Sequence, residues 1–266
     1  MRHTVNIGLI NIMPNVSQYE SLIRNALNGL EDAITLHPIK LEEHQYKSSS
    51  MPSNYRTFEE TVAATQLDLL IVTGAPVEHL PFEEITYWDE LCEIFRYAQK
   101  NLASVLGICF GGLAVARFLG IKKYTLNDKA YGVHSLLLND ESHRYFPAHQ
   151  RTYDMPMSTW AALDACQVRQ ALGRSVRGIA YHMELGYTVL ESVDHKFLMV
   201  LGHPEYTVQT LRDEWQRDLA RGVAYAQQLA PEAFAEMESK LDGDSNKLID
   251  RWVRSHMAES LAETKY

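Results

Sequence analysis

Short apolar runs alternate with amphipathic stretches over the first two thirds of the chain. This pattern restricts the possible folds more strongly than the composition does. Four runs have the length of a single strand: Val5–Ile12, Ile34–Ile39, Asp68–Thr73 and Ser104–Cys109. Such runs are typical of a parallel sheet, whose strands are buried on both faces because helices cover both sides. The sequence therefore predicts an α/β fold with a mostly parallel sheet and helices on both faces.

Two segments between these runs have a helical pattern. They are Gln18–Leu27 and Phe82–Lys100. In the second, apolar residues recur at intervals of three and four, which places them on one face of a helix; they are Ile85, Trp88, Leu91, Cys92 and Phe95.

The pattern changes after Gly120, where strand-like segments follow one another between turns rich in Asn, Asp, His and Pro. These segments are Tyr131–Leu138, Ser175–Tyr181, Tyr187–Glu191 and Phe197–Gly202. They predict extra, partly antiparallel strands on the same sheet. The chain has a helical pattern from about Thr207 onward, so we expect residues 1–266 to form a single domain with a helical C-terminal tail.

The composition favours a folded, soluble protein. Of the 266 residues, 46% are hydrophobic, which is enough for a full core. The net charge is −9 and no stretch is dense in Lys and Arg, so nucleic acid is not an expected partner. No segment approaches the roughly 20 apolar residues that cross a membrane, and Val5–Ile12 is too short for a signal peptide. We expect a cytoplasmic protein without a membrane partner.

The three cysteines are widely spaced, at Cys92, Cys109 and Cys166. Their number is odd, they form no CxxC pair, and no histidine cluster with the spacing of metal ligands lies near them. A disulfide framework and a metal site are therefore not expected. The remaining question is whether one of the thiols is reactive.

Cys109 stands where an apolar strand ends and a helical pattern begins. Its neighbours Gly107, Gly111 and Gly112 are small, as a tight strand-to-helix turn requires. Such a turn brings the side chain to the carboxyl edge of the sheet, where α/β folds bind ligands. The helix N-terminus favours a thiolate, and the N–H of Phe110 is suited to stabilising an oxyanion. The alternative is that Cys109 only closes a buried strand.

A second motif, Gly202-His203-Pro204-Glu205-Tyr206, also follows an apolar strand and precedes a helical pattern. His203 is suited to act as a general base, and Glu205 to hold the imidazole in the useful tautomer. Pro204 stiffens the turn between them. A lone histidine would more often be a hydrogen-bonded structural residue, but its pairing with the cysteine turn favours a catalytic role.

The cysteine turn followed by His-Pro-Glu resembles the class I glutamine amidotransferase superfamily. In that resemblance Cys109, His203 and Glu205 form the catalytic triad. Amidotransferase turns usually read Gly-x-Cys-x-Gly-x-Gln, whereas this chain has Leu113 at the glutamine position. The departure argues against glutamine hydrolysis.

Four further motifs narrow the resemblance, which runs from Val5 to about Arg221. They are Asn11-Ile-Met-Pro14, Thr73-Gly-Ala-Pro-Val-Glu78, Tyr87-Trp88, and Gly202-His-Pro-Glu-Tyr206 with Gln209-Thr-Leu211 and Arg217. Together they resemble the homoserine O-succinyltransferase and O-acetyltransferase family. The resemblance implies a homodimeric acyltransferase of methionine or cysteine biosynthesis with the same triad.

The resemblance also implies substrate contacts. Lys129, Arg151, Glu214 and Arg217 match family positions around the acceptor, and their charges suit an amino acid, whose carboxylate binds guanidinium and whose ammonium binds carboxylate. Glu78 matches the position that selects the donor, glutamate going with acetyl-CoA and glycine with succinyl-CoA. A carboxylate there would repel the succinyl terminus. We therefore expect acetyl-CoA as co-substrate and no permanently bound cofactor.

Several departures from the family lie near the expected pocket. Asn15 and Val16 replace a basic residue, Phe110 replaces tryptophan, and His134 begins a segment that differs from the usual aromatic-Glu-His. One methylene changes binding by only about 1–3 kcal/mol, so the acceptor of a ping-pong acetyl transfer is equally well L-serine or L-homoserine. The alternatives are a homoserine O-succinyltransferase, a glutamine amidotransferase-type Cys hydrolase, or a binding module without catalysis.

Overall fold

The structure is a computed structural model that describes residues 4–46, 51–139, 144–146, 150–241 and 247–263. The described residues contain one sheet with the strand order β2-β1-β3-β4-β9-β8-β7-β5-β6. The strands are β1 (Val5–Ile10), β2 (Ile34–Ile39), β3 (Leu69–Val72), β4 (Ser104–Ile108), β5 (Lys123–Leu138), β6 (Thr152–Leu163), β7 (Val176–His182), β8 (Gly186–Ser192) and β9 (Phe197–Val200).

Five neighbouring strands, from β2 to β9, run parallel to one another, and the remaining pairs are antiparallel. This confirms the predicted α/β fold with a mostly parallel sheet and additional antiparallel strands in the second half. The helices are α1 (Val16–Ala26), α2 (Phe58–Ala64), η1, a 3-10 turn (Phe82–Glu84), α3 (Trp88–Asn101), α4 (Phe110–Phe118), α5 (Ala165–Ala171), α6 (Val208–Ala220), α7 (Ala224–Gln228), α8 (Ala233–Lys240) and α9 (Leu248–Glu263).

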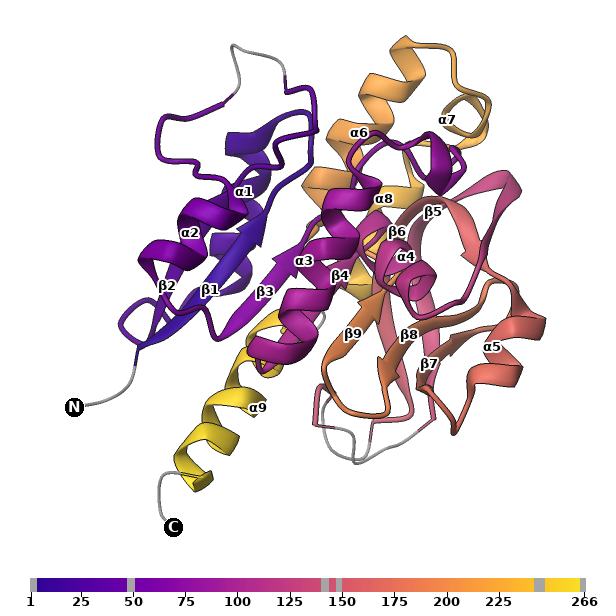
Figure 1. Cartoon of the computed structure of the whole chain (residues 1–266). Helices are drawn as coiled ribbons and strands as arrows, with labels where there is room; N and C mark the ends of the chain where they lie inside the picture. The colour runs from indigo at the N-terminus through magenta and orange to yellow at the C-terminus, as the bar shows by residue number, and fades with distance from the viewer. Residues whose placement is uncertain (1–3, 47–50, 140–143, 147–149, 242–246, 264–266) are drawn as a thin grey trace.

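Helices cover both faces of the sheet (Figure 1). Side chains of α1, α6, α8 and α9 share one core cluster with the sheet, and those of α3, α4 and α5 share the other. Successive residues of β3 alternate between the two clusters, with Leu69 and Ile71 in the first and Leu70 and Val72 in the second. This two-sided burial is why the strand has no polar alternation.

The antiparallel half differs most from the sequence-based expectation. β5 begins at Lys123 rather than at Tyr131, with an irregularity in its pairing between Thr125 and Ala130. Its partner β6 was not predicted, because Asp154, Pro156, Ser158 and Thr159 interrupt the apolar pattern of that strand. β6 is nevertheless mostly buried.

The expected helix over Phe82–Lys100 is in fact two elements, η1 and α3. The chain leaves helical geometry at Ile85, next to Thr86, whose hydroxyl donates to the Glu43 carbonyl; two adjacent β-branched residues also disfavour a helix. The helical pattern expected from about Thr207 is confirmed by α6 to α9. None of the helices in the described part of the chain has the length and apolar composition of a membrane-spanning segment.

Candidate active site

Cys109 lies in a sharp turn between β4 and α4. Its φ of 51° lies in the left-handed region, which is unusual for a residue that is not glycine. The turn fits only because its neighbours lack side chains: a Cβ on Gly111 would lie 2.2 Å from the Val72 carbonyl oxygen, and one on Gly112 would lie 2.8 Å from that of Val200. The turn therefore has the geometry of a nucleophile elbow.

The elbow brings the sulfur next to loops from other strands. The Cys109 N–H donates to the Val200 carbonyl at 2.7 Å, and its Sγ lies 3.9 Å from the Ser158 carbonyl oxygen. A Cβ on Gly74, just after β3, would lie 3.5 Å from both the Cys109 Cβ and the His203 Cε1. Cys109, His203 and the loop that begins at Thr73 therefore meet at one point.

His203 and Glu205 form a buried pair. The Nδ1 of His203 lies 2.7 Å from the Glu205 Oε1, and both residues are 3% exposed. The same Oε1 accepts a hydrogen bond from the Tyr19 hydroxyl at 2.5 Å. The ring of Tyr206 stacks on the imidazole with centroids 4.0 Å apart. The carboxylate thus orients the ring through Nδ1, as a base in a triad requires.

The charges around His203 favour its protonated form. Burial by itself would lower the pKa of the imidazole, but the negative charges of Cys109 and Glu205, and the hydrogen bonds to both, raise it well above its usual value. An imidazolium beside a thiolate is the arrangement that activates a cysteine nucleophile.

A pocket of about 650 Å³ opens in front of the sulfur. Its lining includes Cys109 and His203, the donor-selection candidate Glu78, and three of the four expected acceptor contacts, Lys129, Glu214 and Arg217. Arg151 does not line it: this exposed residue stands just before β6, and its carbonyl accepts the Leu138 N–H. The side chain of Phe110 is buried against Phe82 and Tyr87, so only its backbone N–H is a candidate for the oxyanion contact.

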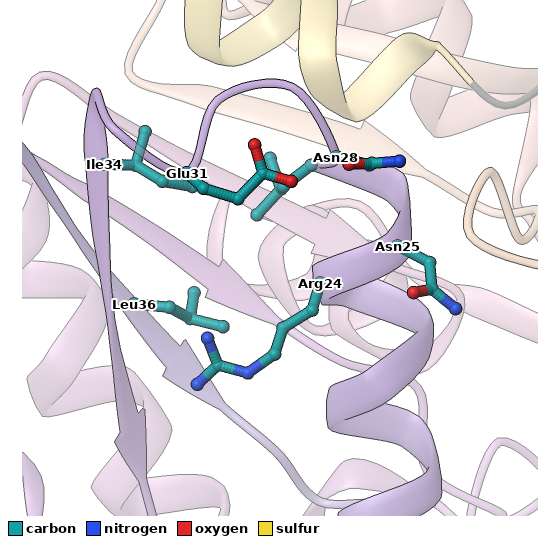
Figure 2. A pocket seen from close by; sticks show the side chains of 7 residues that line it. Arg24, Asn25, Asn28, Glu31, Ile34 and Leu36 are labelled. Carbon is teal, nitrogen blue, oxygen red and sulfur yellow. The ribbon is translucent and has the colours of Figure 1, made fainter.

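A second pocket lies between the end of α1 and the start of β2 (Figure 2). Arg24 and Glu31 are the charged residues of its lining, and Arg24 already pairs with Glu20 at 2.7 Å. This pocket is at the amino ends of the parallel strands, whereas ligands of open α/β sheets bind at the carboxyl ends. It is therefore not the candidate active site.

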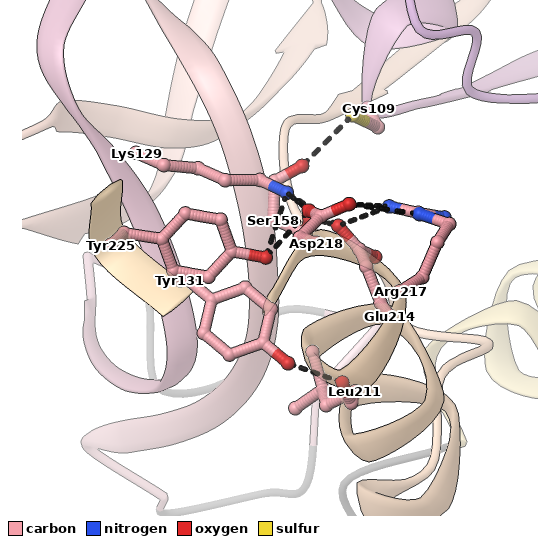
Figure 3. A network of polar contacts seen from close by, with 9 residues as sticks. All are labelled: Cys109, Lys129, Tyr131, Ser158, Leu211, Glu214, Arg217, Asp218 and Tyr225. Carbon is pink, nitrogen blue, oxygen red and sulfur yellow. Dashed lines mark hydrogen bonds and ion pairs between the residues drawn. The ribbon is translucent and has the colours of Figure 1, made fainter. Parts of the chain in front are cut away.

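A charged network forms one wall of the active-site pocket (Figure 3). The Lys129 ammonium lies 2.5 Å from Glu214 and 3.3 Å from Asp218. Arg217 pairs with Asp218 at 2.8 Å and lies 3.5 Å from Glu214. Ser158 also donates to Glu214, at 2.5 Å. Two cations thus balance two carboxylates. A bound zwitterion, with one positive and one negative group, can pair with one residue of each sign without leaving a buried charge unpaired.

Sequence reasoning missed four residues of this network: Ser158, Asp218, Tyr131 and Tyr225. Tyr225 donates to Asp218 at 2.7 Å, and the hydroxyl of Tyr131 donates to the Leu211 carbonyl. Ser158 was missed together with its strand. Asp218 carried a usable signal, since it lies one helical turn from Glu214 on the same face of α6.

The described residues contain no group of three or more His, Cys, Asp or Glu side chains placed to hold a metal ion. The site contains a thiol, an imidazole held by a carboxylate, backbone N–H groups at the start of a helix, and a charged wall. These are the components of nucleophilic acyl transfer.

The fold and the elbow define the fold class of the protein. A glutamine amidotransferase from Thermotoga maritima superimposes with a TM-score of 0.63 at 14% identity, over 97% of this chain and 99% of that chain. A glutamine amidotransferase from Methylobacillus flagellatus superimposes with a TM-score of 0.63 at 13% identity, over 96% of this chain and 95% of that chain. At these identities the likeness concerns the fold alone, and it confirms the predicted class I glutamine amidotransferase-like fold.

The sequence comparisons then identify the family. The family model described as homoserine O-succinyltransferase matches residues 2–261. A homoserine O-acetyltransferase of Ruegeria sp. (strain TM1040) is 33% identical over 257 residues, 95% of this chain and 78% of the relative. A homoserine O-acetyltransferase of Jannaschia sp. (strain CCS1) is 36% identical over 223 residues, which make up 82% of this chain and 70% of the relative. The chain belongs to the homoserine O-succinyltransferase family, and this membership supports an acyltransferase.

Loss of the Cys109 sulfur should lower the pKa of His203. Cys109→Ser replaces the sulfur with a hydroxyl that stays neutral, so the contribution of Cys109 to the raised pKa of His203 disappears. NMR detection of the imidazole nitrogens across a pH titration measures the shift. His37, whose pKa is lowered by burial and by Arg56, is the internal control and should titrate alike in both proteins. An unchanged titration of His203 would contradict the electrostatic coupling.

Proposed function

We propose that the protein is an O-acetyltransferase that moves an acetyl group from acetyl-CoA, through an acyl-Cys109 intermediate, to the side-chain hydroxyl of L-serine or L-homoserine. The proposal rests on the elbow thiol beside the buried His203–Glu205 pair, with Cys109 and His203 in the lining of a pocket that has a charged wall. Membership of the homoserine O-succinyltransferase family supports it.

In the first half-reaction the Cys109 thiolate attacks the thioester carbonyl carbon. The new C–S bond forms as the carbonyl π electrons move to oxygen. The Phe110 N–H at the start of α4 and an amide of the loop after β3 stabilise this oxyanion. The tetrahedral intermediate then expels the CoA thiolate, which takes the proton of the His203 imidazolium and leaves as a thiol.

In the second half-reaction neutral His203 acts as a general base. It takes the proton of the acceptor hydroxyl as the oxygen attacks the acyl-Cys109 carbonyl. Collapse of the second tetrahedral intermediate breaks the C–S bond, so Cys109 returns as a thiolate beside an imidazolium and the O-acetyl ester leaves. Water has to be excluded in between, because hydrolysis of the thioester would waste the acyl group.

The charged wall suits an amino-acid acceptor. Arg217 is half-exposed to the pocket and is suited to a carboxylate, while Glu214 is suited to an ammonium group. Lys129 is 5% exposed in its side chain and sets the position of Glu214 through their ion pair. Arg151 lies outside the pocket lining and so gains no support as a substrate contact.

Two acceptors fit this wall. The names of the curated relatives favour L-homoserine, whereas the departures at Asn15, Val16 and His134 leave room for L-serine, which is one methylene shorter. One methylene changes the relative preference for two substrates by only about 1–3 kcal/mol, so L-serine and L-homoserine are proposed equally.

Glu78 is the proposed donor selector. It is 7% exposed and lines the pocket. Lys123 holds its segment in place by donating from Nζ to the carbonyls of Glu78, at 2.5 Å, and Leu80, at 2.6 Å. A buried carboxylate at a fixed position would repel the terminal carboxylate of a succinyl group.

An assay of CoA release tests the proposed acetyl transfer. The enzyme is mixed with acetyl-CoA or succinyl-CoA and with L-serine, L-homoserine or L-glutamine, and thiol release and products are followed. We expect acetyl-CoA to be consumed with serine or homoserine, and Cys109→Ala to lose the activity because no thiolate remains. Cys166→Ala removes an exposed thiol outside the pocket and should stay fully active. Ammonia released from glutamine without CoA turnover would instead favour the Cys hydrolase.

Removing the Glu78 carboxylate should relax donor choice. In Glu78→Gly we expect the ratio of kcat/KM for succinyl-CoA over acetyl-CoA to rise by at least roughly tenfold, because an unfavourable contact between like charges costs several kcal/mol. Glu78→Gln keeps the volume without the charge and so separates repulsion from steric exclusion. A ratio unchanged in both variants would rule out Glu78 as the donor selector.

A further inference from the structure

The carboxylate that orients His203 has a second donor, Tyr19. The Tyr19 hydroxyl lies 2.5 Å from the Glu205 Oε1, the oxygen that also contacts the His203 Nδ1 at 2.7 Å. The other oxygen, Oε2, is buried and has no hydrogen-bond partner among the residues that the structure describes. Tyr19 and His203 therefore share one oxygen of a carboxylate that receives no other side-chain bond there.

The phenol is held in place from the start of α1. Tyr19 is 3% exposed and belongs to the core cluster on that face of the sheet. Its N–H donates to the Asn15 carbonyl at 3.1 Å, and the buried Asn11 amide donates to the Val16 carbonyl at 2.8 Å. The first turn of α1 is thus tied to the end of β1, which fixes the direction from which the hydroxyl approaches Glu205.

We propose that Tyr19 is a positioning residue, which acts on the base His203 through Glu205 by holding the carboxylate and sharing its hydrogen-bonding capacity. The phenol acts only as a donor: burial, followed by the negative charge of Glu205, raises the pKa of Tyr19 well above its usual value, so it stays protonated. A donor that occupies Oε1 weakens that oxygen as an acceptor for the imidazole.

The consequence for His203 has a definite sign. With Tyr19 present, Glu205 orients the ring but stabilises the imidazolium less than an unshared carboxylate would. Without the phenol, Oε1 becomes the stronger acceptor and the pKa of His203 rises further, so less neutral base is present at a given pH. The other titratable groups around this centre are Cys109 and Tyr206, and both remain when Tyr19 is changed.

Tyr19 also lines the substrate pocket, so a direct contact with the acceptor is the competing explanation. The two explanations differ in their kinetics. A positioning role changes kcat and the pH dependence and leaves KM nearly unchanged, whereas a lost substrate hydrogen bond raises KM and leaves the acid limb of the profile where it was.

Tyr19→Phe separates these explanations. We expect kcat for acyl transfer to fall roughly tenfold, because the loss of one hydrogen bond to a charged group has an effect of that size. The acid limb of the pH profile of kcat should move to higher pH, and KM should stay nearly unchanged. Tyr145→Phe is the matched control, because it removes a 2.7 Å phenol bond to another buried carboxylate, Glu191, which has no place in the pocket lining. Its profile should match the wild type.

A double-mutant cycle with Glu205→Gln tests whether Tyr19 works through Glu205. In the Glu205→Gln background, Tyr19→Phe should cause little further loss, since the shared carboxylate is already gone. Additive losses, a raised KM with an unmoved acid limb, or an equal effect of Tyr145→Phe would each overturn the inference.

The kinetic part rests on the proposed acyl transfer, so one measurement is independent of substrate. An NMR titration of the His203 ring nitrogens in Tyr19→Phe should give a higher pKa than in the wild type, with that of His37 unchanged. If acyl transfer is absent but this shift is found, the proposed function fails and the positioning role stands. If transfer is present and neither this titration nor the acid limb moves, the positioning role fails alone.

Discussion

The backbone geometry of the Cys109 elbow dictates how closely the surrounding strands must pack. Cys109 adopts a φ of 51°, a conformation that costs a residue with a Cβ about 1–3 kcal/mol. Gly111 and Gly112 pass so close to the Val72 and Val200 carbonyls that a methyl group at either position would overlap them. Close approach of this kind requires the parallel strands β3, β4 and β9 to be neighbours, and their burial on both faces offsets the local strain.

That constraint explains why the site is assembled from segments far apart in the sequence. The order β1-β3-β4-β9 brings the loops at the carboxyl ends of four parallel strands to one edge. Tyr19 lies in the segment that follows β1, Gly74 and Glu78 lie in the loop after β3, Cys109 directly follows β4, and His203 lies in the turn after β9. The paired strands β5 and β6 contribute Lys129 and Ser158 to the charged wall, and α6 contributes Glu214, Arg217 and Asp218.

The sequence predicts this site best where short-range chemistry decides the structure. The elbow glycines, the His203-Pro204-Glu205 turn and the parallel strands all have patterns confined to a few residues. The assignment of Arg151 rests on motif matching alone and stays a prediction, because the residue lies outside the pocket lining. Ser158 and its strand β6 could not be predicted, because Asp154 and Pro156 break the apolar pattern and the strand is defined by its pairing with β5. The bond from Tyr19 to Glu205 joins residues 186 positions apart, so no local pattern indicates it.

A single-turnover experiment tests whether Cys109 carries the acyl group. The enzyme is mixed with acetyl-CoA alone, quenched and digested, and the acetylated peptide is identified by mass spectrometry; acceptor is then added and the loss of the adduct is timed. We expect one acetyl group on Cys109, and we expect it to disappear on addition of acceptor at a rate no slower than kcat. An adduct that is absent, that lies on another residue, or that decays more slowly than turnover would contradict this expectation.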